Sequence, residues 1–282
     1  MPGAHYQPWS YAEPFGWWGF SSEGQGRSIA ELIRDDVLTA RVAAFLWLAL
    51  EHRASLVVAA EPHGAGKTTL LTALLDFLPA EAAPTYLRGW YERFEFLDST
   101  TPESAYLLCN EISQHLPTYL WGRGVRRVFE AARQGYGLAT TMHATGAAGV
   151  LTLLTAYPLE VPIEHAAVLD FVLTLGIGPR RGEVVRRLLR LEEVRLTPDG
   201  VLIEPLAERD VLLSELESRP GQLVGVLGAR FGLEPDAAAA ELARREQFLR
   251  RLVARGVTAP EAVRAAIQAF RKPPEGEAQG GR

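Results

Sequence analysis

The chain has 282 residues, of which 48% are hydrophobic and 22% are charged, and its formal net charge is -5. This length and composition allow a substantial buried core and are typical of a globular protein with one main domain and a smaller one. The negative charge argues against a general nucleic-acid binder. The single cysteine, Cys109, excludes an internal disulfide. No signal-peptide pattern opens the chain and no apolar run is as long as a membrane span, so we expect a cytoplasmic protein.

Residues 1–27 are predicted to form an aromatic arm with little periodicity. Its aromatic residues lie among Gly, Pro and Ser and are Tyr6, Trp9, Tyr11, Phe15, Trp17, Trp18 and Phe20. Because such a segment would promote aggregation if it stayed exposed, we expect it to pack on the body of the protein or on a partner chain.

Beyond the arm, the apolar pattern predicts an α/β core followed by helices. A helix begins after Ser28, and a second apolar helix runs from about 39 to 51. Short apolar runs then alternate with amphipathic helices as far as about Glu204, which predicts a mostly parallel sheet. Helical patterns follow near 206–218, 220–231, 235–256 and 259–271. We therefore expect a core over 28–205, a small helical domain over 206–271 and a disordered tail over 272–282.

The stretch from Leu56 to Leu71 carries the strongest chemical signal. It reads as a buried strand, a glycine loop that includes Glu61-Pro62-His63-Gly64-Ala65-Gly66, and the start of a helix. This is the layout of a phosphate-binding loop, in which backbone N–H groups surround a β-phosphate and the lysine reaches the β- and γ-phosphates. A plain glycine turn would not require a lysine and two threonines directly after Gly66. The predicted nucleotide-binding residues are Gly64, Ala65, Gly66, Lys67, Thr68 and Thr69, with ATP as ligand and the Thr68 hydroxyl on Mg²⁺.

A later apolar strand, Ala105-Tyr106-Leu107-Leu108-Cys109-Asn110-Glu111, ends in an acid. In a phosphate-loop protein this places a carboxylate beside the Mg²⁺ and the attacking water, so Glu111 is predicted both to order that water and to ligate the metal. Apolar strands that end in glutamate are common, so a purely structural role for Glu111 stays open.

A third apolar strand, Gly137-Leu138-Ala139-Thr140-Thr141-Met142, is followed by His143. In a doubly wound sheet the carboxyl ends of the strands face the ligand, so His143 is a candidate sensor of the γ-phosphate. The alternative is a histidine at the surface or hydrogen-bonded in the core. Comparable context is lacking for His5, His52, His115 and His165.

In their order along the chain, these segments resemble the secretion-ATPase superfamily of type II and type IV secretion and pilus motors. The resemblance is greatest for the branch that contains archaeal flagellar and pilus ATPases and tight-adherence ATPases. It covers about residues 29–271 and rests on Ala44-Phe45-Leu46-Trp47-Leu48-Ala49-Leu50-Glu51, the phosphate loop, Glu111, Thr140-Thr141-Met142-His143-Ala144, Tyr157-Pro158-Leu159-Glu160-Val161-Pro162 and Glu241-Leu242-Ala243-Arg244-Arg245-Glu246-Gln247-Phe248-Leu249.

The resemblance implies a RecA-like motor core that hydrolyses ATP with Mg²⁺, forms a homo-hexamer and pushes on a membrane platform protein. It implies a cytoplasmic location, either free or peripheral at the inner face of the membrane. The large N-terminal domain that covers the nucleotide cleft in full-length relatives has no counterpart here. We expect those contacts to come from another chain or from the aromatic arm, or to be lost.

Several positions depart from the family pattern. Glu61 replaces the first glycine of the phosphate loop, and its carboxylate costs affinity unless it points away from the phosphates. Asn110 replaces a glycine before the acid. The acidic box of the family falls near 88–92, where only Glu92 retains an acid, and that residue is a further candidate for catalysis. The arginine that follows the acid in the family is absent. Arg123, Arg126 and Arg127 lie nearby, either as arginine fingers for a neighbouring nucleotide or as a solvated basic helix face.

Three hypotheses for function follow from these features. The leading one is an ATP-hydrolysing motor subunit for pilus assembly or protein secretion. The second is a catalytically weak or inactive nucleotide-binding paralogue that acts as a structural or regulatory partner in a ring. The third is a DNA-directed RecA-like ATPase, against which the acidic net charge and the secretion-like motif around His143 argue.

Overall fold

The computed structural model describes residues 10–16 and 26–272. It therefore covers only part of the predicted arm, 1–27. Of the predicted tail, 272–282, only Lys272 belongs to the described residues, and the rest of that prediction lies outside them.

The described part of the arm lies against the body of the protein. The ring of Tyr11 meets that of Phe96 edge-on, with centroids 5.6 Å apart, and Phe15 meets Tyr91 in the same way at 6.3 Å. The backbone N–H of Tyr86, at the end of strand β2, donates to the carbonyl of Tyr11 at 2.8 Å. Of the two expected arrangements, packing on the body of the protein or on a partner chain, the described part of the arm shows the first.

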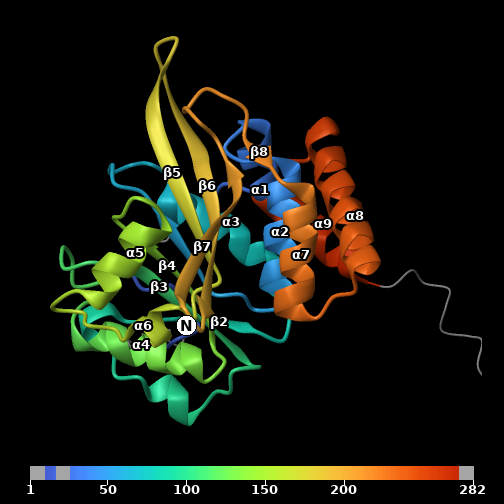
Figure 1. Ribbon diagram of the computed structural model, residues 1–282. Helices are drawn as coiled ribbons and strands as arrows, with labels where there is room; N and C mark the ends of the chain where they lie inside the picture. Colours follow the sequence, from blue (N-terminus) through green and yellow to red (C-terminus); the bar gives the residue numbers. More distant parts are fainter. Residues whose placement is uncertain (1–9, 17–25, 273–282) are drawn as a thin grey trace, which may run out of the picture.

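An eight-stranded sheet runs through the molecule in the order β2-β3-β4-β1-β5-β6-β7-β8 (Figure 1). Its strands are β1 (Leu56–Ala59), β2 (Ala83–Tyr86), β3 (Ala105–Ile112), β4 (Gly137–Met142), β5 (Phe171–Arg180), β6 (Glu183–Thr197), β7 (Gly200–Glu208) and β8 (Glu217–Ser218). Four pairs of neighbouring strands are parallel, namely β2–β3, β3–β4, β4–β1 and β1–β5. The remaining pairs, β5–β6, β6–β7 and β7–β8, are antiparallel. The predicted α/β class with a mostly parallel sheet is confirmed, and β1 lies between β4 and β5.

Helices cover both faces of the sheet. They are α1 (Ile29–Arg34), α2 (Ala40–Glu51), α3 (Lys67–Leu74), α4 (Arg123–Arg133), α5 (Gly146–Thr155), α6 (Ile163–Ala166), α7 (Pro220–Phe231), α8 (Pro235–Ala254) and α9 (Pro260–Arg271), with 3-10 turns at Leu75–Phe77, Gly89–Tyr91 and Glu95–Asp98. One hydrophobic cluster joins α1 to α3 and α7 to α9, and another joins α4 to α6. Successive residues of β1 alternate between them, Leu56 and Val58 in the first and Val57 and Ala59 in the second, because neighbouring side chains of a strand point to opposite faces.

The two predicted helices before β1 are confirmed, and their starts follow from capping. Ser28 and Glu31 form a reciprocal capping box at α1, and the Thr39 hydroxyl accepts the N–H of Val42 at the start of α2. Most of α2 is buried on all sides, which explains its continuous apolar sequence.

The segment after β5 differs from the prediction. Instead of alternating strands and helices up to Glu204 and a helix over 206–218, the chain forms long antiparallel strands, a loop and the short strand β8. Leu206 and Ala207 belong to β7, where Ala207 pairs with Leu191. Just beyond the strand, the backbone N–H of Arg209 donates to the carbonyl of Leu189. Pairing with β6 satisfies the backbone and buries these apolar side chains, so tertiary contacts override a helical spacing.

The C-terminal helices predicted at 220–231, 235–256 and 259–271 are confirmed as α7, α8 and α9. Each begins with a proline at its first position, where the missing N–H costs nothing, at Pro220, Pro235 and Pro260. These helices share one hydrophobic cluster with α1 and α2. Their separation from the core as a domain stays a prediction.

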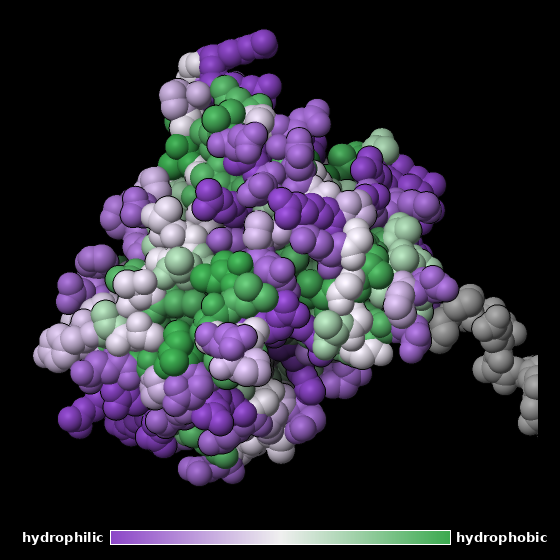
Figure 2. All heavy atoms as spheres, in the orientation of Figure 1, coloured by the Kyte–Doolittle hydropathy of each residue, from purple (hydrophilic) through white to green (hydrophobic). Residues whose placement is uncertain are grey.

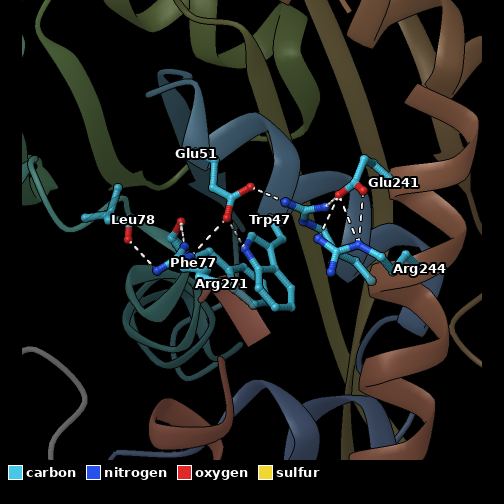
Figure 3. Close-up of polar contacts among 8 residues, drawn as sticks. Trp47, Glu51, Phe77, Leu78, Glu241, Arg244 and Arg271 are labelled. Carbon is cyan, nitrogen blue, oxygen red and sulfur yellow. Dashed lines mark hydrogen bonds and ion pairs between the residues drawn. The ribbon is translucent and has the colours of Figure 1, made fainter. Parts of the chain in front are cut away.

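A polar network joins α8 and α9 to α2 (Figure 3). The Glu51 carboxylate accepts Trp47 Nε1 at 2.7 Å and Arg271 Nε at 3.0 Å, and it pairs with Arg245 at 2.5 Å. Arg271 also donates to the carbonyls of Phe77 and Leu78, just beyond α3. The C-terminal helices thus fix the far end of the helix that follows the predicted phosphate loop.

The surface carries some exposed apolar side chains around α5 and α6, namely Leu153, Tyr157 and Ile163. On the face drawn in Figure 2, apolar surface gathers in the middle, while the protruding tip of the β5–β6 hairpin is hydrophilic. Within residues 10–16 and 26–272, no helix has the length and apolar character needed to cross a membrane.

Candidate nucleotide-binding site

The chain turns from β1 into α3 through a loop that exposes backbone N–H groups. Gly64 and Gly66 have φ angles of +73° and +93°, which glycine adopts at little cost and other residues resist. Gly66 caps α3 without any side-chain hydrogen bond. The first N–H groups of α3 therefore have no intrahelical partner and carry the positive end of the helix dipole, which makes this terminus suited to an anion such as phosphate.

Three parallel strands end beside this loop. Ala59 of β1 lies opposite Met142 of β4, which lies opposite Ile112 of β3 beyond an irregularity in the register. Glu111 lies within that irregular stretch of β3, and His143 directly follows β4. Because the carboxyl ends of parallel strands meet at one edge of the sheet, the topology gathers these two side chains beside the loop.

Lys67, Glu111 and His143 form a compact group. Lys67 Nζ lies 3.0 Å from His143 Nε2 and 3.6 Å from Glu111 Oε2, and His143 Nε2 lies 3.6 Å from Glu111 Oε1. His143 Nδ1 lies 2.9 Å from the carbonyl oxygen of Glu61, which can only accept a hydrogen bond. The proton of a neutral imidazole therefore sits on Nδ1 and leaves Nε2 to accept from Lys67.

Burial shapes the electrostatics of this group. The side chains of Lys67 and Glu111 are each 8% exposed. Burial lowers the pKa of the Lys67 ammonium, and the nearby Glu111 carboxylate opposes that shift. The Thr141 hydroxyl donates its one proton to the carbonyl of Asn110 at 2.9 Å, and its oxygen lies 3.5 Å from Glu111 Oε2. A phosphate next to Lys67 would restore the stability of its charged form.

A cavity of about 560 Å³ opens in front of this group, a size typical of small-ligand sites. It combines charged groups with apolar walls from α1, α3 and β5. It is lined by Arg27, Leu32, Val37, His63, Gly64, Ala65, Gly66, Lys67, Thr68, Thr69, Leu70, Glu111, His115, Leu116, Tyr119, His143, Leu175 and Arg186. All six predicted loop residues, together with Glu111 and His143, therefore meet at one cavity.

Glu61, which replaces the first glycine of the motif, does not line this cavity. Its side chain is exposed, and its backbone carbonyl orients His143. The Glu61 carboxylate is therefore not part of the cavity wall, although this residue replaces a glycine of the motif.

Glu92 is the predicted catalytic residue that the structure does not bring to the cavity. Its carboxylate accepts the hydroxyl of Tyr11 at 2.6 Å and the backbone N–H groups of Arg88 and Phe94 at 2.8 and 2.6 Å. Burial, and then this hydrogen bond, raise the pKa of Tyr11. The structure thus places Glu92 outside the cavity, where its carboxylate holds the loop around it and the described part of the arm, and its role in catalysis stays a prediction.

Three aromatic or imidazole side chains at the cavity had no signal in the sequence. His63 belongs to the loop itself, and its ring centroid lies 4.4 Å from that of His143. His115 and Tyr119 follow β3, where the chain folds back so that the N–H of Leu120 donates to the carbonyl of Glu111 at 2.9 Å. The spacing of residues in the sequence does not predict that the chain after β3 folds back onto Glu111.

The residues at the cavity fit Mg²⁺ only together with phosphate oxygens and water. Within the described ranges, no group of three or more His, Cys, Asp or Glu side chains is arranged to hold a metal ion. Thr68 and Glu111 supply one hydroxyl and one carboxylate, and Mg²⁺ commonly binds through one or two protein oxygens plus substrate phosphates. The predicted metal residues thus suit an ion that arrives with a nucleotide.

The arginines of α4 lie outside the cavity. Arg126 pairs with Glu160 at 3.2 Å, and the guanidinium of Arg127 lies 4.6 Å from the ring centroid of Phe94. Arg123 is exposed at the start of the helix. Their action on a nucleotide of a neighbouring chain stays a prediction.

Comparisons with known proteins give distant matches. No protein-family model matches the chain. It is 26% identical over 276 residues to the uncharacterized protein MJ0900 of Methanocaldococcus jannaschii, which covers 86% of this chain and 48% of that protein. It is also 26% identical over 190 residues to the uncharacterized protein MJ1287 of the same organism, covering 58% of this chain and 67% of that protein. The chain thus spans about half the length of the first of these relatives.

Two solved structures are similar in part. The VirB11 ATPase from the Brucella suis type IV secretion system, in complex with sulphate, aligns with a TM-score of 0.39 and 18% identity over 56% of this chain and 59% of that one. The Legionella pneumophila ATPase DotB aligns with a TM-score of 0.33 and 13% identity over 79% of this chain and 64% of that one.

Proposed function

We propose that this chain binds Mg-ATP and hydrolyses it as the motor subunit of a pilus-assembly or protein-secretion machine. One observation carries the nucleotide part of the proposal. A buried lysine at the start of α3 lies 3.0 Å from a histidine and 3.6 Å from a carboxylate, each supplied by the end of a different parallel strand. A glycine turn with a structural lysine would not need this grouping around a cavity.

In this proposal the phosphates bind to the N–H groups between Gly64 and Thr69, and Lys67 moves its hydrogen bonds from His143 to phosphate oxygen. Glu111, then free of Lys67, accepts a proton from the water that attacks the γ-phosphorus. The bond between that phosphorus and the bridging oxygen breaks, and ADP and phosphate are the products. Bound Mg²⁺ would neutralise phosphate charge. His143, held through Nδ1 by the Glu61 carbonyl, presents Nε2 to the γ-phosphate region.

The motor part of the proposal rests on the resemblance of the ordered motifs to secretion and pilus ATPases. By that resemblance the chain forms a homo-hexamer at the inner face of the membrane and acts on a platform protein. The acidic net charge disfavours nucleic acid as the partner.

The test is ATP turnover by the purified chain, measured alone and with the proteins encoded by its genomic neighbours, together with light scattering with and without Mg-ATP. We expect slow turnover alone, faster turnover with the partner, and a nucleotide-promoted ring. A chain that stays monomeric at every concentration with Mg-ATP would contradict the ring.

A second candidate is a nucleotide-binding paralogue that does not hydrolyse ATP. The structural use of Glu92 favours it, because that carboxylate is engaged by three donors away from the cavity. Nucleotide binding without any hydrolysis, even in the presence of the membrane partner, would select this candidate.

A further inference from the structure

An arginine from the antiparallel part of the sheet lies over the phosphate loop. Arg186, on β6, donates from Nε to the carbonyl oxygen of Gly64 at 2.7 Å. A Cβ atom built on Gly66 would lie 3.3 Å from Cδ of Arg186. Gly66 therefore does more than permit a positive φ, since its missing side chain leaves room for this arginine against the loop.

The neighbouring residues fix the position of Arg186. Leu188 donates its N–H to the carbonyl of Val37 at 2.7 Å, and Arg187 pairs with Asp36 at 3.1 Å and donates to the carbonyl of Asp35 at 2.7 Å. These contacts tie β6 to the turn between α1 and α2. Because successive side chains of a strand point to opposite faces, anchoring Arg187 on one face directs Arg186 to the other, where the loop lies.

The charge of Arg186 is available to a ligand. Its one assigned hydrogen bond uses Nε on a neutral carbonyl, and among the described residues no carboxylate forms an ion pair with it. Arg27, the other arginine of the cavity wall, pairs with Asp35 instead. A guanidinium carries five N–H donors in a planar fork, so the Nη groups of Arg186 remain for phosphate oxygens while Nε holds the loop.

We propose that Arg186 contacts the phosphates of the nucleotide bound by its own chain, acting in cis as a second cation beside Lys67. The proposal rests on the proposed nucleotide binding and goes beyond it, since it assigns the arginine of the site to the β5–β6 hairpin of the same chain. No neighbouring subunit and no arginine of α4 is needed for this contact.

The first experiment is calorimetric titration with Mg²⁺ and a non-hydrolysable ATP analogue. Arg186→Ala should weaken binding about tenfold or more, as expected for the loss of a charge-assisted hydrogen bond. Arg186→Lys, which keeps the charge, should recover part of the affinity. Arg190→Ala is the matched control, because Arg190 is exposed on the same strand and does not line the cavity. Wild-type affinity in Arg186→Ala would overturn the proposal.

The salt dependence separates a phosphate contact from a purely structural tether of the loop. Arg186 is exposed, so a direct charge interaction is screened as ionic strength rises from about 0.05 to about 0.5 M. The affinity ratio between wild type and Arg186→Ala should shrink over this range. A ratio that does not change with salt would show that Arg186 only holds Gly64.

A mixing experiment tests whether the contact is made in cis. Lys67→Ala chains keep Arg186 but should not bind nucleotide themselves. Adding an excess of them to Arg186→Ala should leave the weak affinity unchanged. Recovery of wild-type affinity would show that the arginine acts on a neighbouring chain and would overturn the cis assignment.

Titrating the wild type and Lys67→Ala with the same analogue separates a failure of the Arg186 assignment from a failure of the proposed nucleotide binding. If the wild type does not bind the analogue, nucleotide binding fails and the role of Arg186 fails with it. If the wild type binds, Lys67→Ala does not, and Arg186→Ala binds like the wild type, only the assignment of Arg186 fails. Circular dichroism of each variant checks that the fold is retained.

Discussion

The parallel and antiparallel parts of the sheet contribute to the candidate site in different ways. In the parallel part, Lys67, Glu111 and His143 all lie at or just beyond strand ends, and they converge because those ends share one edge. The antiparallel part contributes Arg186 from within a long strand that is tied to the turn before α2. In the parallel part, a residue's place at the end of a strand in the sequence is enough to predict that it lies at the site. In the antiparallel part, Arg186 can be assigned to the site only once the path of the β5–β6 hairpin is known.

The largest expected effect is on the parallel part. Lys67→Ala should abolish detectable Mg-ATP binding, with a loss of about 100-fold or more, because it removes the buried cation that faces the phosphates. Calorimetry measures the affinity, and circular dichroism checks the fold. Lys272→Ala is the matched control, since Lys272 is the other lysine of the chain and is exposed. Equal ATP affinity in Lys67→Ala and wild type would contradict the assignment of this cavity as the nucleotide-binding site.

Glu111→Gln should keep ATP affinity and slow single-turnover hydrolysis about 100-fold, the effect of losing a positioned general base. Glu92→Gln sharpens the comparison, because the structure places its carboxylate away from the cavity. We expect the rate of Glu92→Gln to stay within a few-fold of wild type. If the two variants slow hydrolysis equally, Glu92 belongs to the reaction after all.

Glu51→Gln tests the helices that support the site without lining it. Its carboxylate faces Arg245 and Arg271, and the Arg245 side chain is 8% exposed. Removing the negative charge should lower the free energy of unfolding by about 2 kcal/mol, because the buried Arg245 guanidinium keeps only the carboxylate of Glu241 and Arg271 loses its pairing with Glu51. Chemical denaturation measures this change. Glu241→Gln removes the other carboxylate partner of Arg245, at a side chain that is 39% exposed, and should cost less, about 1 kcal/mol or below, because solvent screens that pair. A change of more than twofold in ATP affinity in Glu51→Gln would show that these helices influence the cavity.

The smallest expected effect is at His143. His143→Ala should lower turnover about tenfold and weaken the discrimination of ATP from ADP, because the γ-phosphate loses a contact from Nε2. Steady-state rates and the two affinities measure it. His165→Ala, on α6 and outside the cavity, is the matched control. Unchanged discrimination in His143→Ala would argue that this histidine only positions Lys67.

Local sequence determined the parts of the protein that depend on neighbouring residues. The capping residues before α1 and α2, the proline starts of α7 to α9, and the glycine loop before Lys67 each act within a few residues, so spacing alone predicts them. Glu111 and His143 were also found, because the end of an apolar strand is visible in sequence and parallel strand ends share an edge.

Tertiary structure decided the features that depend on residues far apart. Glu92 was predicted at the site but meets Tyr11, 81 positions away, and Arg186 had no local signal but meets Gly64, 122 positions away. The segment 206–218 has a helical spacing, yet pairing with β6 gives its first residues a strand. In each case the favourable contact exists only after the sheet has formed, so its free energy is not encoded in any local pattern.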